Sequence, residues 1–124
     1  MFKSKLLLAL VMALSVAVGF IPATSSAANC TIYYSSTIYG STPVNTTTVA
    51  TGPFTTNCTG SFSGSLTNLS SAWLTLQLEK QVSGTWSVVN SGYIAYSGTP
   101  GTYRYTVKNT GNGNGSWRVT YNHP

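Results

Sequence analysis

The chain has 124 residues, six of them Lys or Arg and only one Asp or Glu, giving a net charge of +5; this length allows a single domain with one core. One acidic residue cannot form the carboxylate pair of a glycosidase or a calcium site, and two cysteines with one histidine are too few for zinc. We therefore expect a protein that is not an enzyme and that has no metal or cofactor.

The first residues predict an export signal. A positively charged start is followed by an apolar run, Leu6–Ile21, and then by small residues typical of a cleavage site. The apolar run is shorter than the about 20 residues of a membrane span. We therefore expect a signal peptide over residues 1–28, cleaved after Ala27 or Ala28, and a secreted single domain over residues 29–124 with no membrane span.

The two cysteines are expected to form a disulfide. Cys30 belongs to a predicted first strand, Cys30–Tyr34, and Cys58 follows Phe54 and Thr56 on the apolar face of a second short strand. Secretion places both in a compartment where disulfides persist, and closing this loop contributes about 3–4 kcal/mol in the chain-entropy model. Between them, Gly40–Thr48 is rich in turn residues and contains a proline, which argues against a central strand.

Alternation of apolar and polar residues predicts the strands that follow. Gly60–Thr67 alternates throughout, and Ala72–Glu79 places three leucines on one side, which predicts half-buried strands. Thr85–Asn90 and Tyr93–Tyr96 predict two shorter strands. The chain thus consists of short strands at near-regular spacing, without a helical period.

The segment Ser97–Tyr121 predicts a β-hairpin, because two alternating patterns flank a loop of glycine and asparagine. The apolar face of each strand is aromatic and β-branched and is expected to line the core. The loop, Asn109–Gly115, supplies turn residues rather than a phosphate cradle, since no helix follows it. Together the elements predict an all-β, jelly-roll-like antiparallel sandwich of seven or eight short strands, or alternatively a barrel.

The end of the chain resembles a known family. The sequence PGTYRYTV at Pro100–Val107 and the sequence GSWRVT at Gly115–Thr120, with a glycine-rich turn between them, are similar to the closing hairpin of bacterial pre-peptidase C-terminal domains. Those domains are secreted, jelly-roll-like β-sandwiches appended to extracellular enzymes and associated with secretion or with binding of substrate polymers. The resemblance implies a sandwich fold. The Asp-x-Asp segment usual in that family is absent, since this chain has no aspartate.

Two groups of residues are candidates for ligand binding. The first comprises Trp73, Thr75 and Gln77, which lie on the strand side opposite the leucines. An indole ring can stack against a sugar ring while hydroxyl and amide groups bind the sugar hydroxyls. The alternative for the tryptophan is a structural one, in which a sandwich edge or loop covers it.

The second group is basic and lies on the outer face of the predicted hairpin: Arg104, Lys108 and Arg118. Only the distant Glu79 could neutralise them, so this face would suit an acidic polymer. A solvated face that keeps an edge hairpin soluble explains the same residues. His123, one residue from the end of the chain, is expected to be exposed.

These observations predict a secreted, non-enzymatic binding module that contacts an extracellular polysaccharide or an anionic cell-wall polymer. After signal cleavage four basic residues remain against one acidic residue, too weak a bias for nucleic-acid binding. Two alternatives stay open: a small cationic secreted toxin or antimicrobial factor, and a passive matrix or coat protein.

Overall fold

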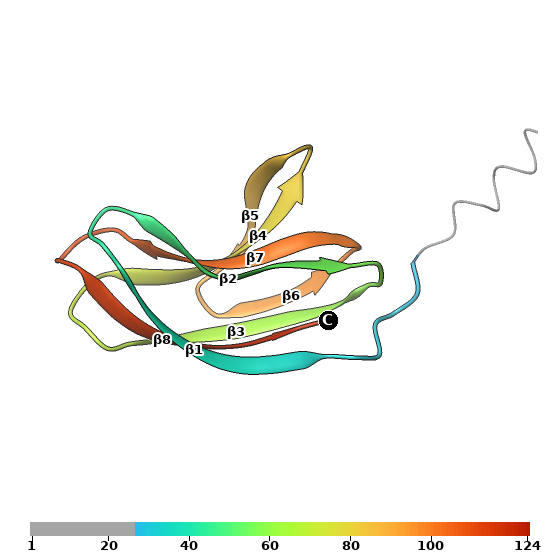
Figure 1. The fold of residues 1–124 in the computed structure, drawn as a ribbon, viewed down its shortest axis with the longest axis horizontal. Helices are drawn as coiled ribbons and strands as arrows, with labels where there is room; N and C mark the ends of the chain where they lie inside the picture. The colour runs from blue at the N-terminus through green and yellow to red at the C-terminus, as the bar shows by residue number, and fades with distance from the viewer. Residues whose placement is uncertain (1–26) are drawn as a thin grey trace, which may run out of the picture.

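The computed structural model describes residues 27–124, and the predicted signal peptide lies outside the described residues apart from its last two positions. The described part is an all-β domain (Figure 1). Within it, no helix has the length and hydropathy needed to cross a bilayer. The strands in chain order are β1 (Tyr34–Thr42), β2 (Thr47–Thr56), β3 (Gly60–Asn68), β4 (Leu74–Val82), β5 (Thr85–Ser91), β6 (Ile94–Gly98), β7 (Gly101–Asn109) and β8 (Gly115–His123).

The eight strands form two antiparallel four-stranded sheets, in the orders β1-β8-β3-β6 and β2-β7-β4-β5. Figure 1 shows the two sheets as layers, with β5 and the end of β4 projecting from one of them. Apart from the β4–β5 hairpin, every connection passes from one sheet to the other. This order is that of a jelly roll with two Greek keys, so the predicted antiparallel sandwich is confirmed.

The predicted hairpin over Ser97–Tyr121 is wrong. Strand β7 pairs with β2 and β4, whereas β8 pairs with β1 and β3 in the opposite sheet. The loop between them therefore crosses from sheet to sheet. A hairpin and a crossing loop have the same local pattern, two alternating strands around turn residues, and only the pairing partners distinguish them.

The predicted first strand is also misplaced. Strand β1 begins at Tyr34, and residues before it are tied to the segment ahead of β3, with Cys30 donating its backbone N–H to the Thr59 carbonyl oxygen at 2.8 Å. Strand β1 reaches Thr42, so much of the segment predicted as turns is strand. Its serines and threonines lack the apolar alternation by which the other strands are recognised. Strand β2 is a sheet edge, which accommodates Pro53.

The predicted disulfide is confirmed. Cys30 and Cys58 are bonded, with their Cα atoms 5.1 Å apart. The bond joins the segment before β1 to the loop between β2 and β3, so it ties the start of the domain to the connection between the two sheets.

The core lies between the sheets and confirms the predicted inward faces. Strands β4 and β7 contribute one side of it, and β3, β6 and β8 contribute the other; its buried members are Phe62, Leu76, Leu78, Ile94, Tyr103, Tyr105, Val107, Trp117, Val119 and Tyr121. The Tyr105 hydroxyl reaches across the core to the carbonyl oxygens of Ser63 at 3.0 Å and Asn122 at 2.8 Å. Burial, with a smaller effect of Tyr121, raises the pKa of Tyr105, so its hydroxyl remains a donor.

Candidate ligand-binding face

The register of β4 and β7 brings most of the candidate residues onto one surface. Thr75 lies opposite Lys108, Gln77 opposite Thr106, and Glu79 opposite Arg104. Residues opposite one another in an antiparallel pair share a face, and here the alternate positions, the leucines of β4, point into the core. We call this side of the sheet the β4–β7 face; it comprises Trp73, Thr75, Gln77, Glu79, Arg104, Thr106 and Lys108. Within it Trp73 and Lys108 are exposed, whereas Glu79 and Thr106 are buried.

Trp73 stands at one end of the β4–β7 face. It precedes β4 and is held by its backbone, which donates to the Gly111 carbonyl oxygen at 3.1 Å and accepts from the Thr110 N–H at 3.0 Å. Its side chain is 64% exposed, so no edge or loop covers it. The indole ring lies over Gly111, where φ is +152° and an added Cβ would come within 3.3 Å of the ring. Glycine at this position thus leaves room for the ring.

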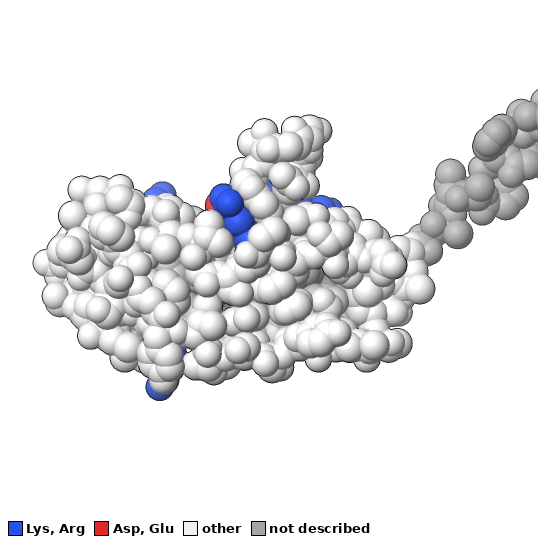
Figure 2. All heavy atoms as spheres, in the orientation of Figure 1, with Lys and Arg blue, Asp and Glu red and all other residues white. Residues whose placement is uncertain are grey.

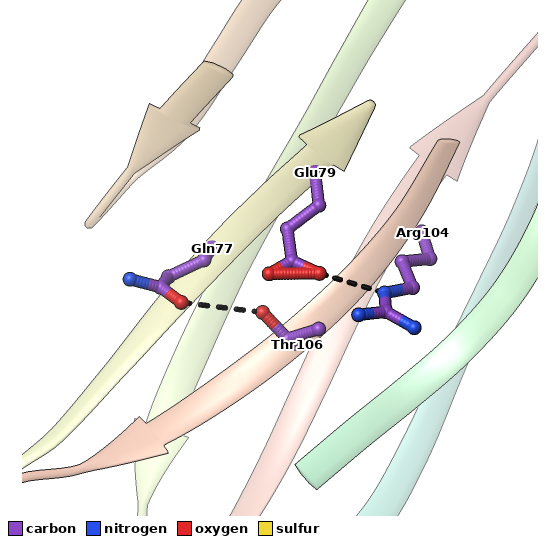
Figure 3. Close-up of polar contacts among 4 residues, drawn as sticks. All are labelled: Gln77, Glu79, Arg104 and Thr106. Carbon is purple, nitrogen blue, oxygen red and sulfur yellow. Dashed lines mark hydrogen bonds and ion pairs between the residues drawn. The ribbon is translucent and has the colours of Figure 1, made fainter. Parts of the chain in front are cut away.

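Glu79 and Arg104 form an ion pair at the other end of the face (Figure 3), with 2.6 Å between Arg104 Nε and Glu79 Oε1. Beside them, the Thr106 hydroxyl donates to Gln77 Oε1 at 3.3 Å. The sequence-based view of Glu79 as distant from the basic residues is therefore wrong. The two residues are 25 positions apart in the chain, and the β4–β7 pairing makes them neighbours.

The hairpin of β4 and β5 adds an aromatic side chain, Trp86, to this face. Its register shifts between Leu78 and Glu79, and such a bulge bends the strand. Trp86 on β5 lies beneath the Arg104 guanidinium, 4.1 Å from ring centroid to Cζ. In Figure 2 the acidic atoms lie next to basic ones at the foot of this projection. Arg104 is thus held on two sides, which sequence reasoning missed because nothing in the local pattern links it to Trp86.

Arg118 does not belong to this surface. It lies on β8, in the other sheet, and donates from Nη2 to Thr67 Oγ1 at 3.3 Å. The expectation that Arg104 and Arg118 are diagonal neighbours is wrong, because the two strands belong to different layers. Figure 2 accordingly shows basic side chains on separate parts of the surface rather than in one patch.

His123 also differs from its expected exposure. It is the last residue of β8, and its ring stacks on Phe54 with 3.7 Å between centroids and on Tyr34 with 5.3 Å. The side chain is part of a stack of rings at the edge of the core. His123 is held in place because the end of β8 pairs with β1. Its position near the end of the chain does not reveal this pairing.

The β4–β7 face combines aromatic, polar and basic groups. It offers an indole ring, hydroxyl and amide groups and the exposed ammonium of Lys108, while its carboxylate is bound to Arg104. Across residues 27–124 no three His, Cys, Asp or Glu side chains gather in a way that could hold a metal ion.

Comparison with known proteins identifies the architecture. The chain matches no family model and no curated protein sequence. Among solved structures, the Yersinia pseudotuberculosis-derived mitogen is similar with a TM-score of 0.59 and 18% identity, over 73% of this chain and 86% of the mitogen. PirA aligns with a TM-score of 0.41 and 19% identity, over 75% of this chain and 95% of PirA. At this identity the mitogen shares the fold of this chain, a small β-sandwich.

Proposed function

We propose that this chain is a secreted, non-enzymatic module that binds an extracellular polymer through the β4–β7 face. The observation that carries the proposal is the exposed indole of Trp73, held by backbone hydrogen bonds beside Thr75 and Gln77 on the same face. An exposed aromatic ring on an anchored backbone can stack on the apolar face of a sugar ring, while the neighbouring hydroxyl and amide groups bind the sugar hydroxyls.

Secretion is part of this proposal. It is supported by the apolar start of the sequence and by the disulfide, which is typical of an oxidising compartment. The absence of an enzymatic activity is proposed because the single carboxylate side chain in the sequence, Glu79, is engaged with Arg104, which leaves no acid to pair with a base.

Retention on insoluble polymers tests the proposal. The disulfide-bonded protein is mixed with bacterial cell wall, cellulose and chitin, and bound protein is measured after washing. We expect retention on at least one polymer, lost in Trp73→Ala and preserved in Tyr39→Ala, which removes an aromatic side chain of similar exposure on the other sheet. Retention on none, or equal retention of both variants, would refute this function of the face.

A second candidate is a secreted factor that acts on other cells. The observation that favours it is the fold shared with a protein named as a mitogen, together with the excess of basic over acidic residues. Adding the purified protein to cultured cells and counting them separates the candidates. A change in cell growth or survival without retention on any polymer would favour this second function.

A further inference from the structure

A hollow of about 300 Å³ opens where β2 begins and β7 ends. Asn109 builds its floor: the buried side-chain amide donates to the Thr42 carbonyl oxygen at 3.0 Å and to the Gly113 carbonyl oxygen at 2.8 Å. Its own Oδ1 accepts from the Gly111 N–H at 3.0 Å. These bonds hold the loops around the hollow, whose lining residues are Asn45, Thr46, Thr47, Lys108, Asn109 and Thr110.

Lys108 carries a charge without a partner in this hollow. Arg104 forms an ion pair with Glu79, the single acidic side chain of the sequence. Lys80 donates to a threonine hydroxyl at 2.7 Å and lies over a tyrosine ring, and Arg118 donates to another threonine hydroxyl. Among the basic side chains of residues 27–124, Lys108 is therefore the one that contacts neither a carboxylate nor a hydroxyl of another described residue, and it is exposed.

A threonine lies on each side of Lys108 in the sheet. The register places Thr47 of β2 and Thr75 of β4 directly opposite Lys108 on its two sides. Opposite residues have Cβ atoms about 5 Å apart, so the row of three spans about 10 Å on one face. Neither threonine hydroxyl bonds to another residue of the described chain. An anionic group at Lys108 would thus find hydroxyl donors on both sides.

Trp73 is rigidly linked to the same hollow. Thr110, which lines the hollow, donates from its backbone N–H at 3.0 Å and from its hydroxyl at 3.4 Å to the Trp73 carbonyl oxygen. Trp73 and Thr75 are two positions apart along one extended segment, so their side chains leave the same face about 7 Å apart. Neighbouring groups of one ligand can therefore contact the indole of Trp73 and the ammonium of Lys108 at the same time.

We propose that the β4–β7 face selects an acidic polysaccharide, with the carboxylate of a uronic acid unit bound at Lys108 and a sugar ring stacked on Trp73. This inference rests on the proposed function and adds its substrate class. A single ammonium between hydroxyls matches one carboxylate on a ring that carries further hydroxyls. A membrane surface is instead attracted by several basic residues together, and on this face Lys108 is the one cation that Glu79 does not neutralise.

Binding to paired polymers with free or methyl-esterified carboxyl groups tests the proposal. The probes are polygalacturonate, alginate and hyaluronan, each compared with its methyl ester, in affinity gels at low salt. We expect the protein to bind at least one acid form about tenfold more tightly than the corresponding ester, and Lys108→Gln to abolish this difference. Arg118→Gln, which removes an exposed charge on the opposite sheet, should leave the difference unchanged.

The outcomes separate this inference from the proposed function. Equal binding of acid and ester forms, lost in Trp73→Ala, would refute the charge selection and leave the polymer-binding role standing. Absence of binding to every polysaccharide tested, including cell wall, cellulose and chitin, would refute both. Binding to phosphatidylglycerol vesicles that depends on Lys108, without binding to any acid polymer, would refute the inference in favour of a lipid surface. An unchanged melting temperature of Lys108→Gln verifies that this exposed substitution leaves the fold intact.

Discussion

The ion pair of Glu79 and Arg104 determines whether Arg104 is available to a ligand, and methionine substitutions test it. Methionine keeps an unbranched side chain while it removes the charge and the hydrogen-bonding groups. Arg104→Met leaves the carboxylate of Glu79, a residue only 8% exposed, without its 2.6 Å partner. Glu79→Met leaves Arg104 stacked on Trp86 and more open to water, so we expect it to destabilise the protein less.

The magnitude follows from the exposure of the two side chains, 25% for Arg104 and 11% for Glu79. A hydrogen bond to a charged group contributes about 1.5–3 kcal/mol, against about 0.2–1 kcal/mol for a pair on the open surface. Since both side chains are mostly shielded, Arg104→Met should lower the free energy of unfolding by about 2 kcal/mol and the melting temperature by about 10 °C. The double variant, an apolar pair, should recover most of this loss.

Urea and thermal unfolding of the wild type, both single variants and the double variant measure the coupling between the two side chains. Arg118→Met serves as the control and should change the free energy of unfolding by less than about 0.5 kcal/mol, because it lies exposed on the other sheet. If the effects of Glu79→Met and Arg104→Met add to within about 0.5 kcal/mol, the pair is a weak surface contact. Arg104 would then be free to contact a ligand, contrary to the reasoning above.

Three further changes test other contacts of the domain. Tyr105→Phe removes the hydroxyl that binds two carbonyl oxygens of the opposite sheet, and urea unfolding should show a loss of about 1–2 kcal/mol. Replacing Cys30 and Cys58 together by serine opens the loop that the disulfide closes, and thermal unfolding should show a loss of about 3–4 kcal/mol. Gly111→Ala directs a methyl group against the Trp73 ring, which should shift its fluorescence and weaken polymer binding about tenfold or less.

Each of these changes has a matched control. Tyr93→Phe removes an exposed hydroxyl that has no partner among the described residues, and a loss equal to that of Tyr105→Phe would contradict the importance of the bond between sheets. The reduced wild-type protein should have the same melting temperature as the double serine variant. A large difference would show that the serines change stability by something other than loss of the disulfide. Gly113→Ala strains the same loop at φ +88° with nothing near its Cβ, so equal weakening by both glycine variants would exclude the ring contact as the cause.

The sequence predicted the strands in which apolar and polar residues alternate, because their apolar side lines the core. Strands without this alternation were predicted less well. Leu76 and Leu78 of β4 and the aromatic residues of β7 and β8 are buried as expected, and Leu74 is partly buried. Strand β1 was missed because an edge strand of serine and threonine has no buried stripe to reveal its period. The residue types of the site were recognisable, since an outward tryptophan beside polar residues follows from the parity of one strand, but Trp86 was not associated with it.

Taken alone, the sequence determined the properties that depend on local pattern and residue inventory: an all-β fold of short strands, a pairing of the two cysteines, and a single carboxylate side chain. The tertiary structure decided which strands are neighbours. Because β7 pairs with β4 and not with β8, Trp73 and Lys108 lie on one face and Glu79 forms an ion pair with Arg104. Arg118 lies in the opposite sheet. The physical reason is that alternation specifies which face of a strand is buried, whereas strand partners are selected by how both sheets close around one core.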